Sequence, residues 1–331
     1  MIYTVDEIKH LHLELSSRCN AACPGCPRNY CGVDIRDDYP LHDMSLSEAQ
    51  TIFQPVFLKQ LREILINGNL GDFITAKDGV EIVKYFKSEN PKLRISISTN
   101  AGIKKTIWKS LAEADVTVLF CLDGLADTHH LYRQQIKWDT VIDNAKDFIL
   151  HGGSAVWKMI LFDHNKHQVD ACKKLSEQLG FKNFELIDHG RNKFTVFTQK
   201  KQFSHVIGNH NDWSTNWNEM HKRFKDFLIS TSGATKDNYQ VENKQIICQA
   251  NKQESIYISA TGDVFPCCWT GFYPSSMHHF GNDEIRPLIT CENNANKVGI
   301  EKAILWFDNF QSAWISSPQP YLCNTQCGVT R

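Results

Sequence analysis

Six short apolar runs alternate with amphipathic segments over the first 190 residues of the chain. The runs occupy residues 10–15, 63–68, 93–99, 116–123, 155–162 and 184–188. The segments between them predict helices over 45–61, 77–89, 104–114, 138–152 and 166–180, with Ser45 or Ser47 as the first N-cap and Gly180 as the last C-cap. Strands that alternate with helices form a parallel sheet covered by helices. This pattern fits both an open doubly wound sheet and a full or partial (β/α) barrel.

Four of the twelve cysteines lie within thirteen residues directly after the first run: Cys19, Cys23, Cys26 and Cys31. Thiolates bind soft metals, and cysteine-only sites with short spacings indicate zinc or iron–sulfur. Three thiolates on a four-iron cluster leave one iron free to coordinate a substrate or cofactor. A zinc knuckle, or a closed cluster with Cys31 as the fourth ligand, remains the alternative.

Charge and hydropathy restrict the partners of the chain. Its net charge is −1, which argues against nucleic acid as a partner. The N-terminus has no basic region followed by an apolar one, and the longest apolar runs are too short to span a bilayer. We therefore expect a cytoplasmic protein without a membrane segment. In that reducing compartment, clustered thiols are metal or redox groups more often than disulfides.

The loop Cys19-x3-Cys23-x2-Cys26 resembles the CxxxCxxC signature of the radical S-adenosylmethionine (SAM) enzymes. This resemblance implies an α/β fold, a partial (β/α)6 TIM-like barrel with a 4Fe–4S cluster at its C-terminal mouth. The open iron of that cluster chelates the amino and carboxylate groups of SAM. An electron from a flavodoxin- or ferredoxin-type donor then allows cleavage of SAM to a 5′-deoxyadenosyl radical, which abstracts a substrate hydrogen. Gly25 departs from the pattern, because an aromatic residue that packs on adenine commonly precedes the third cysteine.

Four strand-end motifs also resemble elements of this family. They are "INGNLGDF" (66–73), which resembles the glycine-rich GGE-type motif, "ISTNAG" (97–102), "LDGLADTHHLYR" (122–133) and "WKMILFDHN" (157–165). The resemblance implies that SAM is bound by Gly68, Asn69, Gly71, Asn100, Asp123, Lys158 and Asn165. Ordinary turn residues and a solvated lysine are the alternative. We expect His129 and His130 to be surface residues at the start of a helix.

A second group of cysteines follows residue 247. The pattern Cys248-x13-Gly262-x4-Cys267 contains a predicted hairpin with a turn at 261–263, and Cys323-x3-Cys327 ends the chain. This spacing resembles the SPASM/twitch extension of radical SAM enzymes, and the short twitch form fits the number of cysteines better. The resemblance implies an auxiliary 4Fe–4S cluster on Cys248, Cys267, Cys323 and Cys327. Cys268 is an alternative to Cys267, Cys291 is a spare, and a four-thiolate zinc site is the other interpretation. Cys121 and Cys172 are expected to be buried free thiols.

The resemblance divides the chain into a partial barrel (1–190), a bridging segment (191–247) with a helix near 217–228, and a small α+β twitch-like domain (248–331). It implies dehydrogenation of a small polar substrate, with the closed auxiliary cluster as electron acceptor. Radical modification of a ribosomal peptide is the alternative, less favoured because no winged helix precedes the first strand. An iron–sulfur or zinc electron carrier or scaffold is the non-enzyme alternative. At the end of the sixth run, the residues expected to position or deprotonate the substrate are Asp188, His189 and Arg191.

Overall fold

One eight-stranded sheet, of order β13-β12-β1-β4-β5-β6-β7-β8, organises the protein. The computed structural model describes residues 4–36, 40–188, 194–208, 214–222, 244–272, 285–315 and 319–329. All six predicted strands are confirmed within one or two residues. They are β1 (His10–Leu13), β4 (Glu63–Ile66), β5 (Arg94–Thr99), β6 (Thr117–Cys121), β7 (Ser154–Ile160) and β8 (Asn183–Ile187).

These six strands are parallel and follow one another across the sheet in chain order. A doubly wound sheet reverses its strand order at one point, whereas a barrel adds strands on one side only. The structure therefore confirms the partial barrel. The strands β8 and β13 form the two edges of the sheet, so the barrel is open within the described part of the chain.

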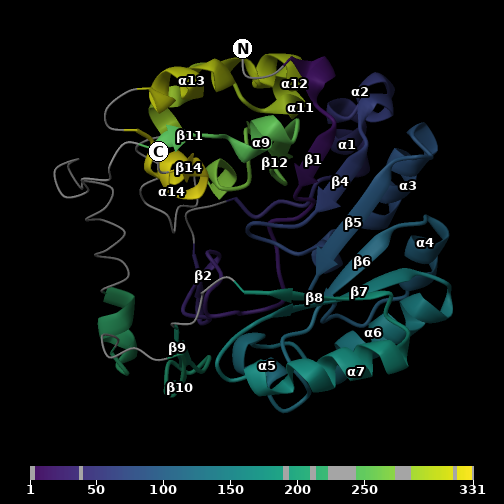
Figure 1. The fold of residues 1–331 in the computed structure, drawn as a ribbon, viewed down its shortest axis with the longest axis vertical. Coiled ribbons are helices and arrows are strands. Elements are labelled where there is room, and N and C mark those ends of the chain that lie inside the picture. Colours follow the sequence, from purple (N-terminus) through teal and green to yellow (C-terminus); the bar gives the residue numbers. More distant parts are fainter. Residues whose placement is uncertain are drawn as a thin grey trace.

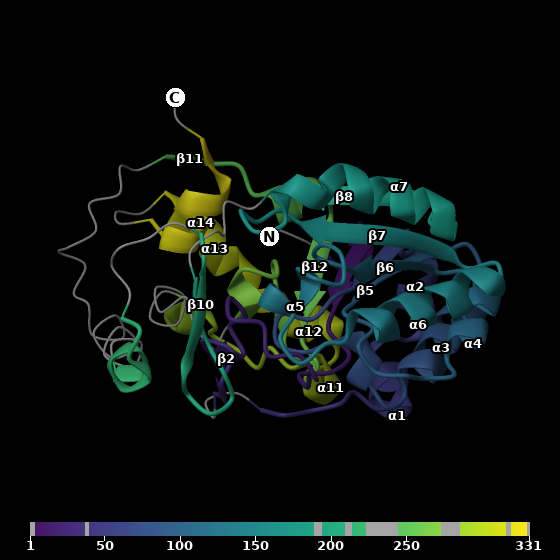
Figure 2. The same ribbon diagram turned by 90° about the horizontal axis from the view of Figure 1, so that it is seen from below.

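Helices connect the strands and cover the outer face of the sheet (Figure 1). They include α3 (Gly79–Glu89), α4 (Trp108–Glu113), α6 (Trp138–Leu150) and α7 (Val169–Leu179), with the short α5 (His129–Tyr132) after β6. Gly180 ends α7 in the left-handed conformation at φ 86°, as predicted. Figure 2 shows α7 close to β8, at one edge of the sheet.

The single helix predicted over 45–61 is wrong, because the segment forms two helices. The first is α1 (Leu46–Ile52), which begins at a capping box in which Ser45 accepts the N–H of Glu48. The second, α2 (Pro55–Gln60), starts at a proline. Proline lacks an N–H and clashes with the preceding turn, so a helix can begin at Pro55 but cannot continue through it.

The predicted C-terminal hairpin is confirmed, and it belongs to the central sheet. Its strands are β12 (Ser255–Ile258) and β13 (Val264–Phe265), and β12 pairs in parallel with β1. Gly262 lies in the turn at φ +87°, a conformation that favours glycine. The sheet therefore joins the first 190 residues to the segment after 248. The division of the chain into domains at these residues stays a prediction.

The remaining elements are short. Two-stranded sheets pair β2 (Asn29–Tyr30) with β3 (Asp34–Ile35), β9 (Phe194–Phe197) with β10 (Phe203–Ile207), and β11 (Gln245–Ile246) with β14 (Gly328–Val329). The 3-10 helices are η1 (Val5–Glu7), η2 (Phe73–Thr75), η3 (Lys166–Gln168), η5 (Thr270–Phe272), η6 (Arg286–Leu288) and η7 (Leu305–Phe307). Residues 217–222 are helical, and the rest of the helix expected there lies outside the described residues.

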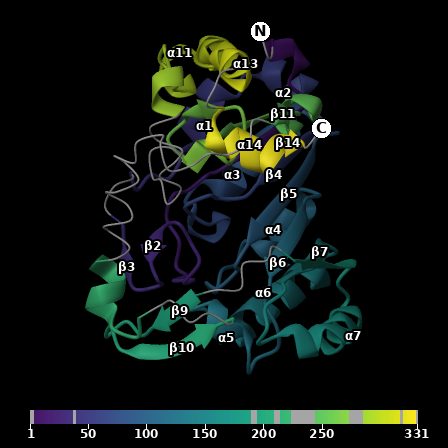
Figure 3. The same cartoon turned by 60° about the vertical axis from the view of Figure 1, so that its left-hand side comes forward.

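The C-terminal helices gather at the β12–β1 end of the sheet (Figures 1 and 3). They are α9 (Gln249–Lys252), α11 (Ala295–Val298), α12 (Ile300–Ala303), α13 (Asp308–Trp314) and α14 (Tyr321–Cys327). Among the described helices, none combines the length and the apolarity that crossing a membrane requires.

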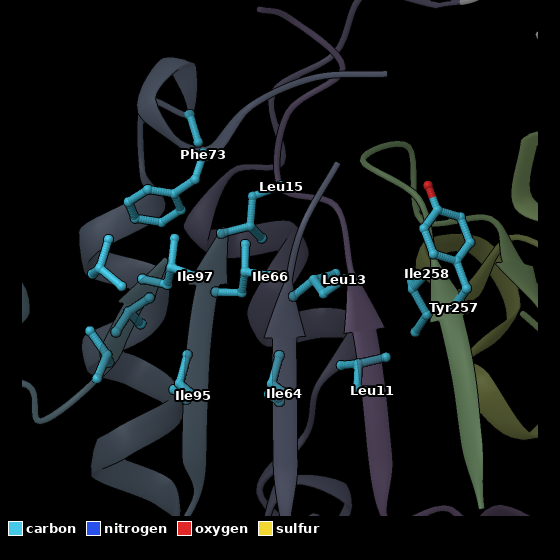
Figure 4. Packing of buried hydrophobic residues seen from close by; sticks show 14 of the residues in the cluster. Leu11, Leu13, Leu15, Ile64, Ile66, Phe73, Ile95, Ile97, Tyr257 and Ile258 are labelled. Atoms are coloured by element: carbon cyan, nitrogen blue, oxygen red, sulfur yellow. The ribbon is translucent and has the colours of Figure 1, made fainter. Parts of the chain in front are cut away.

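Alternation along the strands separates a core face from a concave face. Buried aliphatic side chains of β1, β4 and β5 pack together in the core, as Figure 4 shows: Leu11, Leu13, Ile64, Ile66, Ile95 and Ile97. Side chains at alternate positions of a strand point to opposite faces of the sheet. His10 and His12 therefore lie on the concave face, which faces the interior of the barrel.

Asn144 provides a test of how the helical layer is attached to the sheet. Its amide accepts the indole N–H of Trp108 at 2.8 Å and donates to the carbonyls of Ala101 (2.8 Å) and Ile103 (2.9 Å). Asn144→Leu leaves these three buried groups unsatisfied, so we expect the free energy of unfolding to fall by about 3 kcal/mol in urea titrations. Asp143→Ala, on the exposed face of the same helix, should change it by less than about 0.5 kcal/mol. Equal effects of the two substitutions would contradict the role of Asn144.

Candidate functional site

A cavity of about 390 Å³ lies at the carboxyl ends of the parallel strands, and we call it the mouth cavity. Parallel pairing brings the loops that follow β1, β4 and β5 to this edge together with the last residues of β6 and β7. Of the residues predicted to bind a cluster or SAM, the cavity is lined by Cys19, Cys23, Cys26, Gly68, Asn69, Gly71, Asn100 and Lys158. The structure thus brings together residues that are up to 139 positions apart in the sequence, from Cys19 to Lys158.

Nitrogen donors surround the three thiols. The N–H of Ala21 and the side-chain amide of Asn100 donate to Cys19 Sγ at 3.3 and 3.4 Å. Burial raises the pKa of Cys23 to about 12, although the nearby Arg133 guanidinium lowers it in part. Burial also raises the pKa of Cys19 and Cys26, and the neighbouring thiols add to the increase at Cys19. Such thiols stay protonated unless a metal cation binds them, because coordination removes the proton.

Asp123 and Asn165 lie behind the mouth cavity and do not line it. The carboxylate of Asp123 is fully buried, pairs with Arg133 Nε at 2.6 Å and accepts the N–H of Ile160 at 2.7 Å. Asn165 donates to the carbonyls of Asp123 (3.3 Å) and Ile160 (2.9 Å). Both residues hold the ends of β6 and β7 in place. Sequence analysis did not assign Arg133, although Arg133 ends a motif that it quoted.

The Gly68–Gly71 turn leaves no room for side chains at either glycine. A Cβ at Gly71 would collide with the Ser16 carbonyl, and a Cβ at Gly68 would collide with the carbonyl of Gly71. Glu14, at the end of β1, fixes this turn by accepting the N–H groups of Leu70 (2.8 Å) and Gly71 (2.7 Å). The turn therefore presents bare backbone to the cavity.

Asp72 fixes the next loop in the same way. Its carboxylate is half-buried at the wall of the mouth cavity and accepts the N–H of Asn100 at 2.7 Å and the hydroxyl of Thr99 at 2.5 Å. Burial raises the pKa of both Glu14 and Asp72, and these hydrogen bonds oppose the increase. Neither residue was predicted from the sequence. A polar residue that ends a buried apolar strand was the available signal for Glu14.

His12 separates the mouth cavity from a second cavity of about 450 Å³, the side cavity, and lines both. Cys268 and Trp269 also line both cavities. Burial lowers the pKa of His12 to about 4, so the ring is neutral at pH 7. Its Nε2 lies 2.7 Å from the Asn67 carbonyl, which assigns the proton to Nε2 and leaves a lone pair on Nδ1. The alternation of "HLHLEL" was the sequence signal for this inward-facing histidine.

Four further residues show where the expectations hold and where they fail. Cys172 is a fully buried thiol, as expected, whereas Cys121 is buried but also lines the mouth cavity. His130 is exposed, as expected. The expectation that His129 lies on the surface is wrong: its ring is fully buried, and Nδ1 accepts the N–H of Asp123 at 3.1 Å.

Cys31 lies apart from the three thiols of the mouth cavity. It is buried in a separate apolar cluster with Tyr30, Val33, Phe197, Trp217 and Met220. Burial alone raises its pKa to about 11. Cys31 does not line the mouth cavity.

The four thiols predicted to hold an auxiliary cluster lie close together. Burial, with a smaller contribution from the charges of Cys267 and Cys327, raises the pKa of Cys248 to about 11. Burial and the charges of the other three thiols also raise the pKa of Cys323. Cys291 is directed elsewhere, with its thiol 3.9 Å from the Lys302 carbonyl.

The donor sets of both thiol groups suit iron–sulfur ligation. N–H groups aimed at sulfur stabilise thiolates on a cluster, and Ala21 and Asn100 supply them at Cys19. Near Cys323, the buried indole N–H of Trp314 is directed at the thiol and lowers its pKa. No three His, Cys, Asp or Glu side chains of the described residues surround a position for a single metal ion. A cluster binds its thiolates on separate irons and so needs them further apart.

Of the three residues predicted to act on the substrate, the structure describes only Asp188. Asp188 is exposed at the end of β8 and lines neither cavity. His189 and Arg191 lie outside the described residues.

Comparison with known proteins gives one curated relative and a shared fold. No family model matches the chain. The FeMo cofactor biosynthesis protein NifB of Methanocaldococcus jannaschii is 24% identical over 177 residues, which cover 52% of this chain and 55% of NifB. The match therefore spans about half the length of that relative.

Solved structures of SuiB from Streptococcus suis share the fold at 15% identity. One has a TM-score of 0.54 and covers 94% of this chain and 66% of SuiB. SuiB bound to S-adenosylmethionine has a TM-score of 0.51 and covers 81% and 61%. A likeness at this identity shows the architecture alone.

The protonation state of His12 provides a test of the site. An ordinary histidine titrates near pH 6.5, whereas the pKa of His12 is lowered to about 4 by burial. In NMR titrations we expect the ring signals of His12, assigned with His12→Gln, to stay constant from pH 8 to pH 5. The same residue in urea-unfolded protein should titrate near pH 6.5. Since only the unfolded state then gains a proton, His12 destabilises the fold as pH falls from about 6.5 to about 4. Titration of the folded ring near pH 6.5 would contradict its burial.

Proposed function

We propose that this chain is a radical SAM enzyme that binds a 4Fe–4S cluster and SAM in the mouth cavity and cleaves SAM reductively. The observation that carries the proposal is that Cys19, Cys23 and Cys26 line one cavity together with the Gly68–Gly71 turn and Lys158. A fold shared with SuiB, which has been solved with bound SAM, supports it. Cys31 in its separate apolar cluster leaves the fourth ligand position for SAM.

Each group of the mouth cavity suits one part of SAM. When bound, the cluster supplies the single electron that breaks the sulfonium bond. The bare backbone of the Gly68–Gly71 turn suits the amino group, and the ammonium of Lys158 suits the carboxylate. Tyr132 and Trp269 line the cavity and offer adenine the aromatic surface that Gly25 lacks. A flavodoxin- or ferredoxin-type protein is the proposed electron donor.

We propose that Cys248, Cys267, Cys323 and Cys327 hold an auxiliary 4Fe–4S cluster in a twitch-like unit. Cys267 is followed directly by Cys268, which lines the mouth cavity, so this cluster would lie beside the substrate. Four thiolates leave it no open iron, which suits an electron acceptor. All twelve cysteines are free thiols, in keeping with a reducing, cytoplasmic compartment.

The proposed reaction is dehydrogenation of a small polar substrate. His12 and Lys158 both line the mouth cavity. The neutral imidazole of His12 suits a hydrogen bond to a hydroxyl or amine of the substrate. Asp188, His189 and Arg191 stay the prediction for positioning or deprotonating the substrate. Peptide modification is the second candidate, favoured by the structure of SuiB bound to its precursor peptide SuiA, which has a TM-score of 0.54.

The first cluster has a direct test in the iron content. Two 4Fe–4S clusters need about eight irons per chain after anaerobic reconstitution. Replacing Cys19, Cys23 and Cys26 by Ala should remove about half of the iron and abolish 5′-deoxyadenosine formation from SAM. Cys31→Ala is the matched control, and it should keep both. Loss of both on Cys31→Ala would show that the first cluster is closed.

The auxiliary thiols have a separate test. Cys323→Ala combined with Cys327→Ala should reduce the iron to about four per chain while SAM cleavage continues, because only the first cluster supplies that electron. Cys291→Ala, whose thiol points away from the group, should leave the iron content unchanged. Wild-type protein that holds one zinc and about four irons would refute the auxiliary cluster.

A further inference from the structure

The Gly68–Gly71 turn is connected to the C-terminal hairpin through one buried carboxylate. Glu14 Oε1 accepts the N–H groups of Leu70 and Gly71 at 2.8 and 2.7 Å. Its Oε2 accepts the hydroxyl of Tyr257 at 2.8 Å. Tyr257 is fully buried on β12, the strand that pairs with β1 (Figure 4).

A second hydrogen bond connects the same two segments. The side-chain amide of Asn69, in the middle of the turn, donates to the carbonyl of Cys268 at 2.8 Å. Cys268 follows β13 and adjoins Cys267. The turn is thus attached at two points to a hairpin that lies about 190 residues later in the sequence.

The hydroxyl of Tyr257 is important because Glu14 is buried. A buried carboxylate is stable only when donors satisfy its oxygens, and hydrogen bonds to charged groups are among the strongest in proteins. Without the hydroxyl, one oxygen of Glu14 would face the apolar ring alone. The carboxylate would then move or take up a proton, and its hydrogen bonds to the N–H groups of Leu70 and Gly71 would weaken.

We propose that Tyr257 is a positioning residue for SAM: through Glu14, it holds the Gly68–Gly71 turn in the conformation that receives the ligand. This inference rests on the proposed function for the identity of that ligand. It makes the affinity for SAM depend on the hairpin that carries Cys267. The two iron–sulfur sites are therefore coupled by hydrogen bonds, in addition to any electron transfer.

The test compares two Tyr→Phe substitutions in reconstituted protein. Tyr257→Phe should raise the Kd for radiolabelled SAM in equilibrium dialysis about 3- to 10-fold, with iron per chain unchanged. In metal-free protein it should also speed hydrogen exchange in the 66–73 peptide. Tyr85→Phe is the matched control, since it removes a 2.8 Å hydrogen bond to the Phe53 carbonyl away from the cavity. It should change neither quantity.

Glu14 variants keep the test decisive if Tyr257→Phe does not fold. Glutamine retains an oxygen for the two N–H groups and an amide N–H for the Tyr257 oxygen, so Glu14→Gln should weaken SAM binding less than Glu14→Ala does. Unchanged SAM affinity and exchange in Tyr257→Phe, or in Glu14→Ala, would overturn the coupling alone. Wild-type protein that binds no SAM at all would instead refute the proposed function.

Discussion

Parallel pairing of consecutive strands is the constraint on which the rest of the structure depends. Because β1, β4, β5, β6 and β7 run in the same direction and in chain order, their carboxyl ends meet at one edge. Each loop that leaves this edge contributes one group to the mouth cavity: thiols after β1, bare backbone after β4 and an amide after β5. The helices α1 and α2, α3, α4, α6 and α7 then return the chain along the outer face. After each strand, the loop thus supplies groups to the cavity, and the helix that follows packs against the outer face of the sheet.

Local patterns were sufficient to predict the six strands and the hairpin, and the family resemblance named eight of the twenty-two residues that line the mouth cavity. Two kinds of information were missing. Pro55 breaks a helix whose apolar spacing runs straight through it, so periodicity alone predicted a single helix. The pairing of β12 with β1 joins residues more than 240 positions apart, and no local pattern encodes such a contact. The ion pair of Arg133 with Asp123 was also missed, although the two residues are only ten positions apart in one quoted motif.

The second cysteine group shows how the hairpin serves two sites at once. Cys267 and Cys268 are neighbours in the chain, yet Cys267 lies among the C-terminal thiols while Cys268 lines both cavities. Sequence spacing alone left these two cysteines interchangeable. The strand pairing separates them, because β13 fixes the direction in which the chain leaves the sheet. The C-terminal segment is thus attached to the barrel through the pairing of β12 with β1, the first of the six barrel strands.

Three carboxylates, two of them buried and one half-buried, connect neighbouring strand ends around the mouth cavity by hydrogen bonds. Glu14 links the end of β1 to the loop after β4, Asp72 links that loop to the end of β5, and Asp123 links β6 to β7. Burial of a carboxylate is unfavourable unless donors surround it, and each of these three accepts at least one backbone N–H from the adjacent strand end or loop. If one of these loops moved, the carboxylate would lose a hydrogen-bond donor, which is unfavourable for a buried charge. The loops therefore have one favourable arrangement. The mouth is therefore organised by the chain itself, before any ligand binds.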